Sequence, residues 1–173
     1  MSTQKTAETL HDSVPDALEH KACAVLDKAH NAKKMLATAE SCTGGLLAAL
    51  LTDVHGRGHV FERGYVTYSE EAKSDLLGIP LETIKECNAV SKTVALAMAQ
   101  GALERSNADV TLSITGFAGP GGPDDEEGLV HFACAARGGE TCHREEHFGA
   151  IGRAGVRIAA LEVALSMMDE ALE

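Results

Sequence analysis

The spacing of apolar and polar positions changes from helical to extended and back several times along the chain. Apolar side chains at helical spacing predict an amphipathic helix over residues 14–29. A short apolar run over residues 35–39 predicts a strand, and a second run after two glycines predicts a buried helix to about residue 51. The first third of the chain therefore predicts the order helix, strand, helix.

The middle of the chain carries start and stop signals for its elements. After a loop over residues 52–58, alternation over residues 61–68 favours a second strand. Ser69, followed by two acids and then by glycine at position 78, predicts a short helix, and Pro80 begins another one. Ser91 is expected to cap a long, alanine-rich helix that reaches about residue 105.

The last third of the chain predicts three more strands and a final helix. Residues 110–114 are the third expected strand, and a loop rich in glycine and proline follows over residues 115–127. A close pair of strands over residues 129–136 and 142–148 precedes a helix over residues 152–172. This order implies an α/β fold: a three-layer α/β/α sandwich with a mixed, mostly parallel sheet of about five strands.

Length and composition narrow the class of protein. A chain of 173 residues without linker or repeat predicts a flexible polar tail over residues 1–12 and one domain over residues 13–173. Aromatic residues make up 3% with no Trp, so a base-stacking platform is not expected. The net charge of −11 opposes nucleic-acid binding, which needs clustered basic residues, whereas a small nucleotide needs only a few local donors.

Cysteine and histidine spacing indicates neither a disulfide framework nor a metal centre. The five cysteines are odd in number and contain no C-x-x-C pair. Of the eight histidines only His55 and His59 are close in sequence, and no third ligand is near them, so we expect no metal and no cofactor. No apolar stretch reaches membrane-spanning length and no signal-peptide core is present, so we expect a cytoplasmic protein that does not bind membranes.

The segment Thr38-Ala-Glu-Ser-Cys-Thr-Gly-Gly45 lies at the first expected turn from strand to helix. Backbone N–H groups at a helix start are unpaired and can face an anion or a developing oxyanion. A serine placed there can attack an electrophile that is held against those donors. The alternative is a capped turn, with Ser41 or Thr43 as the N-cap and the glycines permitting close packing.

Three loops follow strands and are expected at the carboxyl edge of the sheet, where ligands gather in open α/β folds. They cover residues 38–45, 68–73 and 115–122. The third contains four glycines in eight residues, which suits either close backbone approach to a ligand or plain flexibility. In the second, Tyr68 is followed by Lys73 about one helical turn later, although a solvated surface lysine fits the same pattern.

Four segments of the chain together resemble the CinA C-terminal domain family. They are Ala39-Glu-Ser-Cys-Thr-Gly-Gly45, Gly64-Tyr-Val-Thr-Tyr-Ser-Glu-Glu-Ala-Lys73, Ala89-Val-Ser91 and Thr115-Gly-Phe-Ala-Gly-Pro120. They occur in the order and at the spacing of that family, and with the final helix they cover roughly residues 15–170.

The resemblance implies an activity and an assembly. Members that have been assigned an activity hydrolyse the carboxamide of nicotinamide mononucleotide to the acid and release ammonia, as Ser/Lys amidohydrolases without a metal. A homo-oligomer, a dimer or higher, is implied as well. Carried over to this chain, Ser41 is the nucleophile, Lys73 the general base, and Tyr68 orients the lysine or relays a proton.

The same resemblance assigns substrate binding to Cys42, Thr43, Gly44, Gly45, Thr115, Gly116 and Arg153. Backbone N–H groups of the first four would hold the oxyanion, and the next two would line the opposite wall. Arg153 would pair with the substrate phosphate. The Cys42 thiol is a competing nucleophile, and packing as a small apolar residue is its other interpretation.

Two positions depart from the family pattern. Glu126-Glu127 stands where many members carry Lys-Pro, which predicts an acidic lip on the pocket that repels a phosphorylated substrate. Gly56-Arg57-Gly58 replaces the usual Gly-Ser-Ser, and Arg57 would restore the lost positive charge. Since some members are inactive paralogues that retain the serine motif, the alternative function is an inactive nucleotide-binding or regulatory module.

Overall fold

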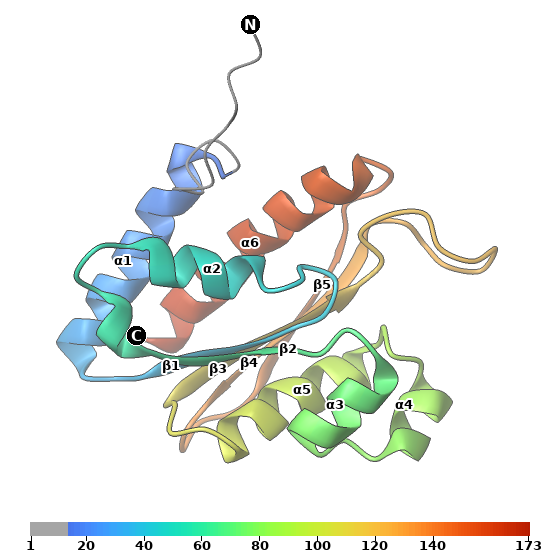
Figure 1. The fold of residues 1–173 in the computed structure, drawn as a ribbon, viewed down its shortest axis with the longest axis horizontal. Helices are drawn as coiled ribbons and strands as arrows, with labels where there is room; N and C mark the ends of the chain where they lie inside the picture. The colour runs from blue at the N-terminus through green and yellow to red at the C-terminus, as the bar shows by residue number, and fades with distance from the viewer. Residues whose placement is uncertain (1–13) are drawn as a thin grey trace, which may run out of the picture.

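A five-stranded mixed sheet lies at the centre of the computed structural model, which describes residues 14–173 (Figure 1). The strands are β1 (Leu36–Glu40), β2 (Phe61–Val66), β3 (Val110–Gly116), β4 (Leu129–Ala136) and β5 (Cys142–His147), in the spatial order β2-β1-β3-β4-β5. β1 pairs in parallel with β2 and β3, β4 is antiparallel to β3, and β5 is antiparallel to β4. Only β4 therefore runs against the others. The predicted tail over residues 1–12 lies outside the described residues.

Helices cover both faces of this sheet, which confirms the three-layer α/β/α architecture (Figure 1). One layer holds α1 (Asp16–Ala32), α2 (Leu46–Asp53) and α6 (Gly152–Ala171). The other holds α3 (Glu70–Leu77), α4 (Leu81–Cys87) and α5 (Lys92–Glu104). A single 3₁₀ turn, η1 (Gly58–Val60), leads into β2. None of the helices in residues 14–173 combines the length and the apolarity that crossing a bilayer would need.

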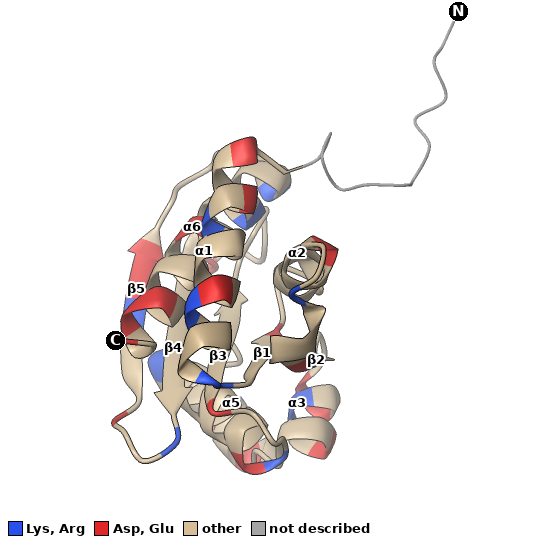
Figure 2. Cartoon of the chain, turned by 90° about the vertical axis from the view of Figure 1, so that its left-hand side faces the viewer, with Lys and Arg blue, Asp and Glu red and all other residues tan. Residues whose placement is uncertain are grey.

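The core is aliphatic, as the scarcity of aromatic residues predicts. All five residues of β1 are buried, because helices cover this strand on both faces. Small side chains allow α5 to lie close to the sheet, since its Ala95 and Ala99 pack against Ala133 and Ala135 of β4. Charged residues lie mainly on outer helix faces and on the edge strand β5 (Figure 2). This close packing gives the strand ends a rigid support.

Several local signals operate as the sequence predicts. The Ser69 hydroxyl accepts a hydrogen bond from the Ala72 N–H at 3.0 Å, and the Ser91 hydroxyl accepts one from Val94, so each serine caps its helix. Gly78 ends α3 in the left-handed conformation with a φ of 68°. The main difference is that β3 extends through Thr115 and Gly116, because both continue the pairing with β4. The third loop therefore begins two residues later than expected.

Candidate active site

The carboxyl ends of β1, β2 and β3 meet at a pocket of about 290 Å³ on one edge of the sheet. All three predicted loops contribute to it, as expected for an open α/β sheet. The pocket is lined by Ser41, Cys42, Tyr68, Lys73, Ala89, Val90, Thr115, Gly116, Phe117, Ala118, Gly119, Pro120, Gly121 and Arg153. The sequence analysis assigned no role to Ala89, Val90 or Phe117, although the first two belong to a segment of the family pattern.

Ser41 and Lys73 lie in direct contact, 32 positions apart in the chain. The Lys73 Nζ is 3.0 Å from the Ser41 Oγ, 2.8 Å from the Thr67 carbonyl oxygen and 3.4 Å from the Tyr68 carbonyl oxygen. A neutral amine has two N–H donors and one lone pair. Donation to the two carbonyls therefore leaves the lone pair available to accept the serine proton. The expected geometry of nucleophile and base is present.

Lys73 is a buried lysine, with a side chain only 1% exposed. Burial lowers its pKa below the ordinary lysine value, because removal from water penalises the charged amine. Among residues 14–173 no carboxylate forms an ion pair with it. A buried amine without a neutralising acid favours the uncharged, basic form. The alternative of a solvated surface lysine is wrong.

The turn that carries Ser41 is held by Glu40, a residue to which the sequence analysis assigned no role. Its buried carboxylate accepts hydrogen bonds from the Leu47 N–H at 3.0 Å, the Ala48 N–H at 2.8 Å and the Thr43 hydroxyl at 2.7 Å. The alternative of a cap by Ser41 or Thr43 is wrong, because the residue at the N-cap position is Gly45 and the Glu40 carboxylate accepts the N–H groups of the first turn. A carboxylate at this place also suits the positive end of α2.

The main chain after Ser41 is shaped by hydrogen bonds on both sides. The Ser41 N–H donates to the Ile114 carbonyl at 2.9 Å, and its own carbonyl accepts the Gly44 N–H at 3.1 Å. Arg157 of α6 donates from Nε to the Cys42 carbonyl at 2.8 Å. Gly44 has a φ of 63°, which a larger residue would adopt only with strain. The Gly44 N–H is therefore engaged within the loop and is not a free oxyanion donor.

Cys42 is buried beside Ser41 and its thiol is unsuited to attack. Burial is the main reason why the pKa of this thiol is raised to about 12. Since the thiolate is the nucleophilic form, almost none is present at neutral pH. The interpretation of Cys42 as a small apolar residue fits its 4% exposure.

Tyr68 lines the pocket through a ring that is largely in solvent. The residue is 68% exposed, and only its main-chain carbonyl contacts the Lys73 amine. The expected orientation of Lys73 by the phenol is wrong, because the carbonyls of Thr67 and Tyr68 hold the amine instead. The other expected role of Tyr68, a proton relay, stays a prediction. The aromatic ring remains available at the mouth of the pocket.

The far wall of the pocket is built by the third loop and by α6. The Thr115 hydroxyl donates to the Ala89 carbonyl at 2.8 Å and so ties the end of β3 to the segment before α5. Gly119 allows Arg153 to approach, because a Cβ on this glycine would lie 2.9 Å from the guanidinium. Within residues 14–173 no acid pairs with Arg153. An unpaired guanidinium at a pocket is suited to an anionic group.

Three of the residues expected to bind substrate do not line the pocket. Thr43 turns toward Glu40, Gly44 packs against Arg157, and Gly45 lies against the Val66 side chain. All three residues support the turn instead.

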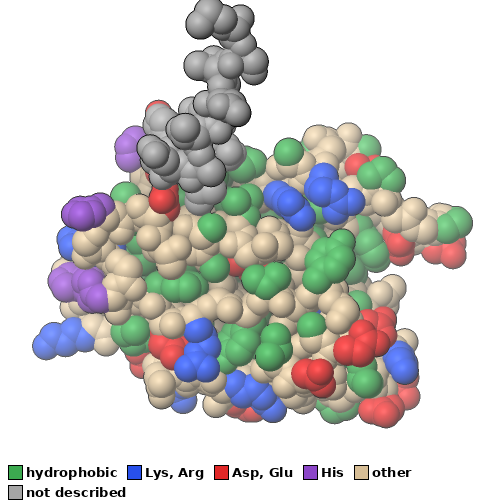
Figure 3. Space-filling model, in the orientation of Figure 1, with side chains coloured by type: hydrophobic (Ala, Val, Ile, Leu, Met, Phe, Trp, Pro, Cys, Tyr) green, Lys and Arg blue, Asp and Glu red, His purple; other side chains and the backbone are tan. Residues whose placement is uncertain are grey.

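The two segments that depart from the family pattern also do not contribute the expected charges to the pocket. Glu126 pairs with His147 at 2.6 Å and neither Glu126 nor Glu127 lines the pocket, so the expected acidic lip is wrong. Acidic side chains gather on the projecting part of the β3–β4 loop (Figure 3). Arg57 forms an ion pair with Asp27 before β2 and does not contact the pocket. It lies at the amino end of that strand, so it cannot replace a positive charge at the carboxyl end.

Curated proteins of two kinds resemble this chain in sequence. A CinA-like protein of Akkermansia muciniphila is 56% identical over 107 residues, which are 61% of this chain and 26% of that protein. The chain thus spans about a quarter of that relative's length. The nicotinamide-nucleotide amidohydrolase PncC of Escherichia coli strain K12 is 46% identical over 133 residues, covering 76% of this chain and 80% of that protein.

Solved structures agree with the sequence comparison. The competence/damage inducible protein CihA of Agrobacterium tumefaciens matches with a TM-score of 0.89 at 42% identity, covering 92% of this chain and 98% of that one. A CinA superfamily protein of Escherichia coli matches with a TM-score of 0.84 at 33% identity, covering 99% and 95%. The model of the CinA C-terminal domain matches residues 18–172. This chain therefore belongs to the CinA C-terminal domain family.

Proposed function

We propose that the protein is an amidohydrolase that converts nicotinamide mononucleotide to nicotinic acid mononucleotide and ammonia through a Ser/Lys mechanism. The observation that carries the proposal is the 3.0 Å contact between the Ser41 hydroxyl and the buried Lys73 amine. The name of the relative PncC, nicotinamide-nucleotide amidohydrolase, supports the substrate class.

In the first half-reaction Ser41 Oγ attacks the carboxamide carbon while Lys73 Nζ takes the hydroxyl proton. Backbone N–H groups of the turn stabilise the negative charge on the carboxamide oxygen. Gly44 is engaged and Thr43 lies outside the pocket, so the N–H of Cys42, which lines the pocket beside Ser41, is the donor that we propose. The tetrahedral intermediate then collapses, the C–N bond breaks, and Lys73 returns the proton to the departing ammonia.

In the second half-reaction water hydrolyses the ester formed on Ser41. Lys73, neutral again, takes a proton from the attacking water and gives one to the Ser41 oxygen as the ester C–O bond breaks. The two carbonyls that hold the amine keep its lone pair toward Ser41 in both steps. The products are the free carboxylic acid and regenerated enzyme.

The remaining lining residues suit the rest of the nucleotide. The pyridinium ring is flat and positively charged, and the exposed ring of Tyr68 offers an aromatic face for it at the pocket mouth. Phe117 adds an apolar surface within the same pocket. Arg153 binds the phosphate, because a guanidinium can donate to two phosphate oxygens at once.

Incubation of the pure chain with nicotinamide mononucleotide, followed by assay of ammonia and of the acid nucleotide, tests the proposal. Equal amounts of both products, lost in Ser41→Ala, are expected. Binding of the nucleotide without release of ammonia would overturn the enzymatic proposal and favour the inactive binding module. Binding by itself is measured by isothermal titration calorimetry with the same protein.

Arg153→Ala is expected to raise KM for nicotinamide mononucleotide by roughly tenfold or more and to leave kcat nearly unchanged. The reason is that a phosphate contact remote from the carboxamide contributes equally to ground-state and transition-state binding. Steady-state kinetics at low ionic strength measure both constants. Arg144→Ala is the matched control, since that arginine pairs with Glu170 on the surface. An unaltered KM in Arg153→Ala would show that the phosphate binds elsewhere.

The pH dependence should report on Lys73. The base must be neutral, so kcat/KM is expected to rise with pH through the lowered pKa of Lys73 and to level off before the ordinary lysine value is reached. In the unfolded chain the amine regains its ordinary pKa, so between the two values the unfolded state binds more protons. The free energy of unfolding should therefore rise with pH in this window, and Lys73→Met should abolish that rise.

Kinetics and urea unfolding across this pH range measure the two effects. A rise of kcat/KM that is centred at the ordinary pKa of lysine would contradict the assignment of Lys73 as a buried neutral base.

A further inference from the structure

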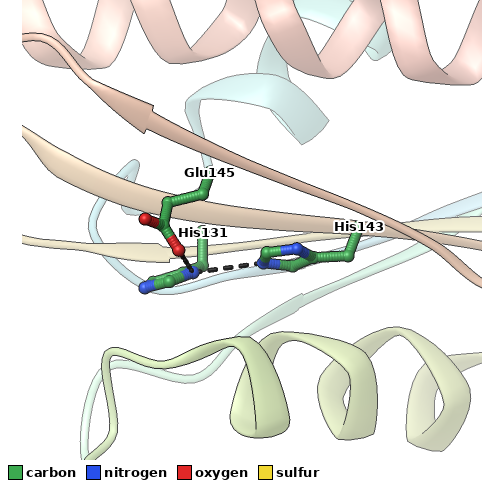
Figure 4. A group of neighbouring side chains, drawn as sticks. All are labelled: His131, His143 and Glu145. Carbon is green, nitrogen blue, oxygen red and sulfur yellow. Dashed lines mark hydrogen bonds and ion pairs between the residues drawn. The ribbon is translucent and has the colours of Figure 1, made fainter.

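A second group of chemically active side chains lies on the β4–β5 pair, outside the pocket. It consists of His131 on β4 with His143 and Glu145 on β5 (Figure 4). In the antiparallel register His131 is opposite Glu145, and His143 is opposite Ala133. Directly opposed residues and those two positions along share one face of the sheet, so all three side chains converge. The sequence analysis missed this group because its histidines are 12 positions apart.

The distances in this group match those between the ligands of a tetrahedral metal ion. His131 Nδ1 is 3.1 Å from His143 Nε2 and 3.5 Å from Glu145 Oε2. All three ligand atoms lie within 4.8 Å of one another. Zinc bonds to nitrogen and oxygen of about 2.0–2.1 Å at the tetrahedral angle place neighbouring ligand atoms about 3.3 Å apart.

The three ligands differ in their exposure to solvent. His131 is only 6% exposed, whereas the Glu145 side chain is 45% exposed. The site therefore has one protected imidazole at its base and one side open to solvent.

The carboxylate ligand is oriented by a further pair of residues. His147 Nε2 contacts Glu145 Oε1 at 3.0 Å, which leaves Oε2 toward His131. His147 Nδ1 in turn contacts Glu126 Oε1 at 2.6 Å. Such outer partners of metal ligands are typical of built metal sites. Glu126 departs from the family pattern, and its contact with His147 makes it a partner of this group and not of the pocket.

We propose that His131, His143 and Glu145 bind one divalent transition-metal ion of the Zn²⁺ type, with a remaining coordination position open to solvent. Two imidazoles and one carboxylate suit Zn²⁺, whereas Mg²⁺ and Ca²⁺ prefer sites made of oxygen atoms. The ion fastens the edge strand β5 to β4. Because His131 is paired in register with Thr115, it also stiffens the wall of the pocket.

A second pair of neighbouring histidines in the chain serves as a comparison for this proposal. His30 Nδ1 and His59 Nε2 lie 2.8 Å apart on another part of the surface. Within the described residues they belong to no group of three ligands. Two imidazoles alone bind a metal ion more weakly than three ligands with one negative charge. His59→Ala is therefore the matched control for His143→Ala.

The test is a titration of the metal-free full chain with Zn²⁺, followed by calorimetry and by competition with a chromogenic chelator. One equivalent is expected to bind tightly in the wild type. His143→Ala and Glu145→Gln should each weaken it by roughly 10–100-fold or more, since loss of even an outer partner has an effect of that size. His59→Ala should leave the affinity unchanged. Co²⁺ should give the intense visible spectrum of a tetrahedral site in the wild type and in His59→Ala, but not in His143→Ala or Glu145→Gln.

Thermal unfolding of each apo variant verifies that the chain is folded, and added Zn²⁺ should raise the melting temperature of wild type and His59→Ala alone. Buried His131 is left intact so that loss of binding cannot be attributed to loss of the core. Absence of stoichiometric Zn²⁺ binding in the wild type would overturn the proposal. Equal affinity in wild type, His143→Ala and Glu145→Gln would overturn it as well, and neither outcome bears on turnover at Ser41.

Discussion

Ser41→Ala or Lys73→Met is expected to lower kcat for nicotinamide mononucleotide by at least about 10³-fold. Without the Ser41 hydroxyl no covalent intermediate forms. Without the Lys73 amine, 3.0 Å away, the hydroxyl keeps its proton and is a poor nucleophile. Ammonia release at saturating substrate measures the loss. The double variant should be little worse than either single one, because nucleophile and base act as a unit.

Cys42→Ala is the matched control for this pair. The Cys42 thiol adjoins Ser41 and its pKa is raised to about 12, so its removal should preserve most of the activity. An inactive Cys42→Ala variant together with an active Ser41→Ala variant would identify the thiol as the nucleophile. Circular dichroism of each variant excludes unfolding as the reason for a loss.

Glu40→Ala is expected to lower the free energy of unfolding by about 3 kcal/mol or more, because each donor left unpaired in a buried place costs about 1–3 kcal/mol. The change leaves the Leu47 and Ala48 N–H groups and the Thr43 hydroxyl without their acceptor in a buried place. Urea unfolding at neutral pH measures the loss. Glu40→Gln should be milder, because the amide oxygen retains one acceptor.

A glutamate in the first turn of another helix provides the comparison. Glu71 of α3 is exposed, so Glu71→Ala should change the free energy of unfolding by less than about 1 kcal/mol. Since the Glu40 carboxylate holds the turn of Ser41, Glu40→Gln should also lower kcat in protein that is fully folded. A loss of stability in Glu40→Ala no larger than in Glu71→Ala would contradict the assigned role of this carboxylate.

The sequence predicted the order of the elements, the serine caps of α3 and α5 and the three loops of the pocket. Such signals are local, because hydrophobic spacing and residues such as Ser69, Ser91 and Gly78 act within one or two helical turns. The approach of Lys73 to Ser41 followed from the rule that parallel strands end at one edge, together with the family resemblance. The homo-oligomer and the cytoplasmic location stay predictions.

The predictions that were wrong concern where individual side chains turn. Glu40 and not Ser41 or Thr43 caps α2, carbonyls and not the Tyr68 phenol hold Lys73, and the Glu126 carboxylate faces His147. The partners of Glu40 and Lys73 lie within eight positions in the chain, so these contacts depend on how the turn folds, whereas His147 reaches Glu126 from strand β5. Composition and spacing carry no information about such partners.

The sequence by itself therefore determined the α/β class, the order of the elements and the segment that supplies the serine, because these depend on neighbouring positions in the chain. Only the tertiary structure decided that Lys73 is buried and that His131 meets His143 and Glu145. Burial sets the charge of a group, and strand register sets which side chains converge. Both arise only when segments distant in the sequence pack together.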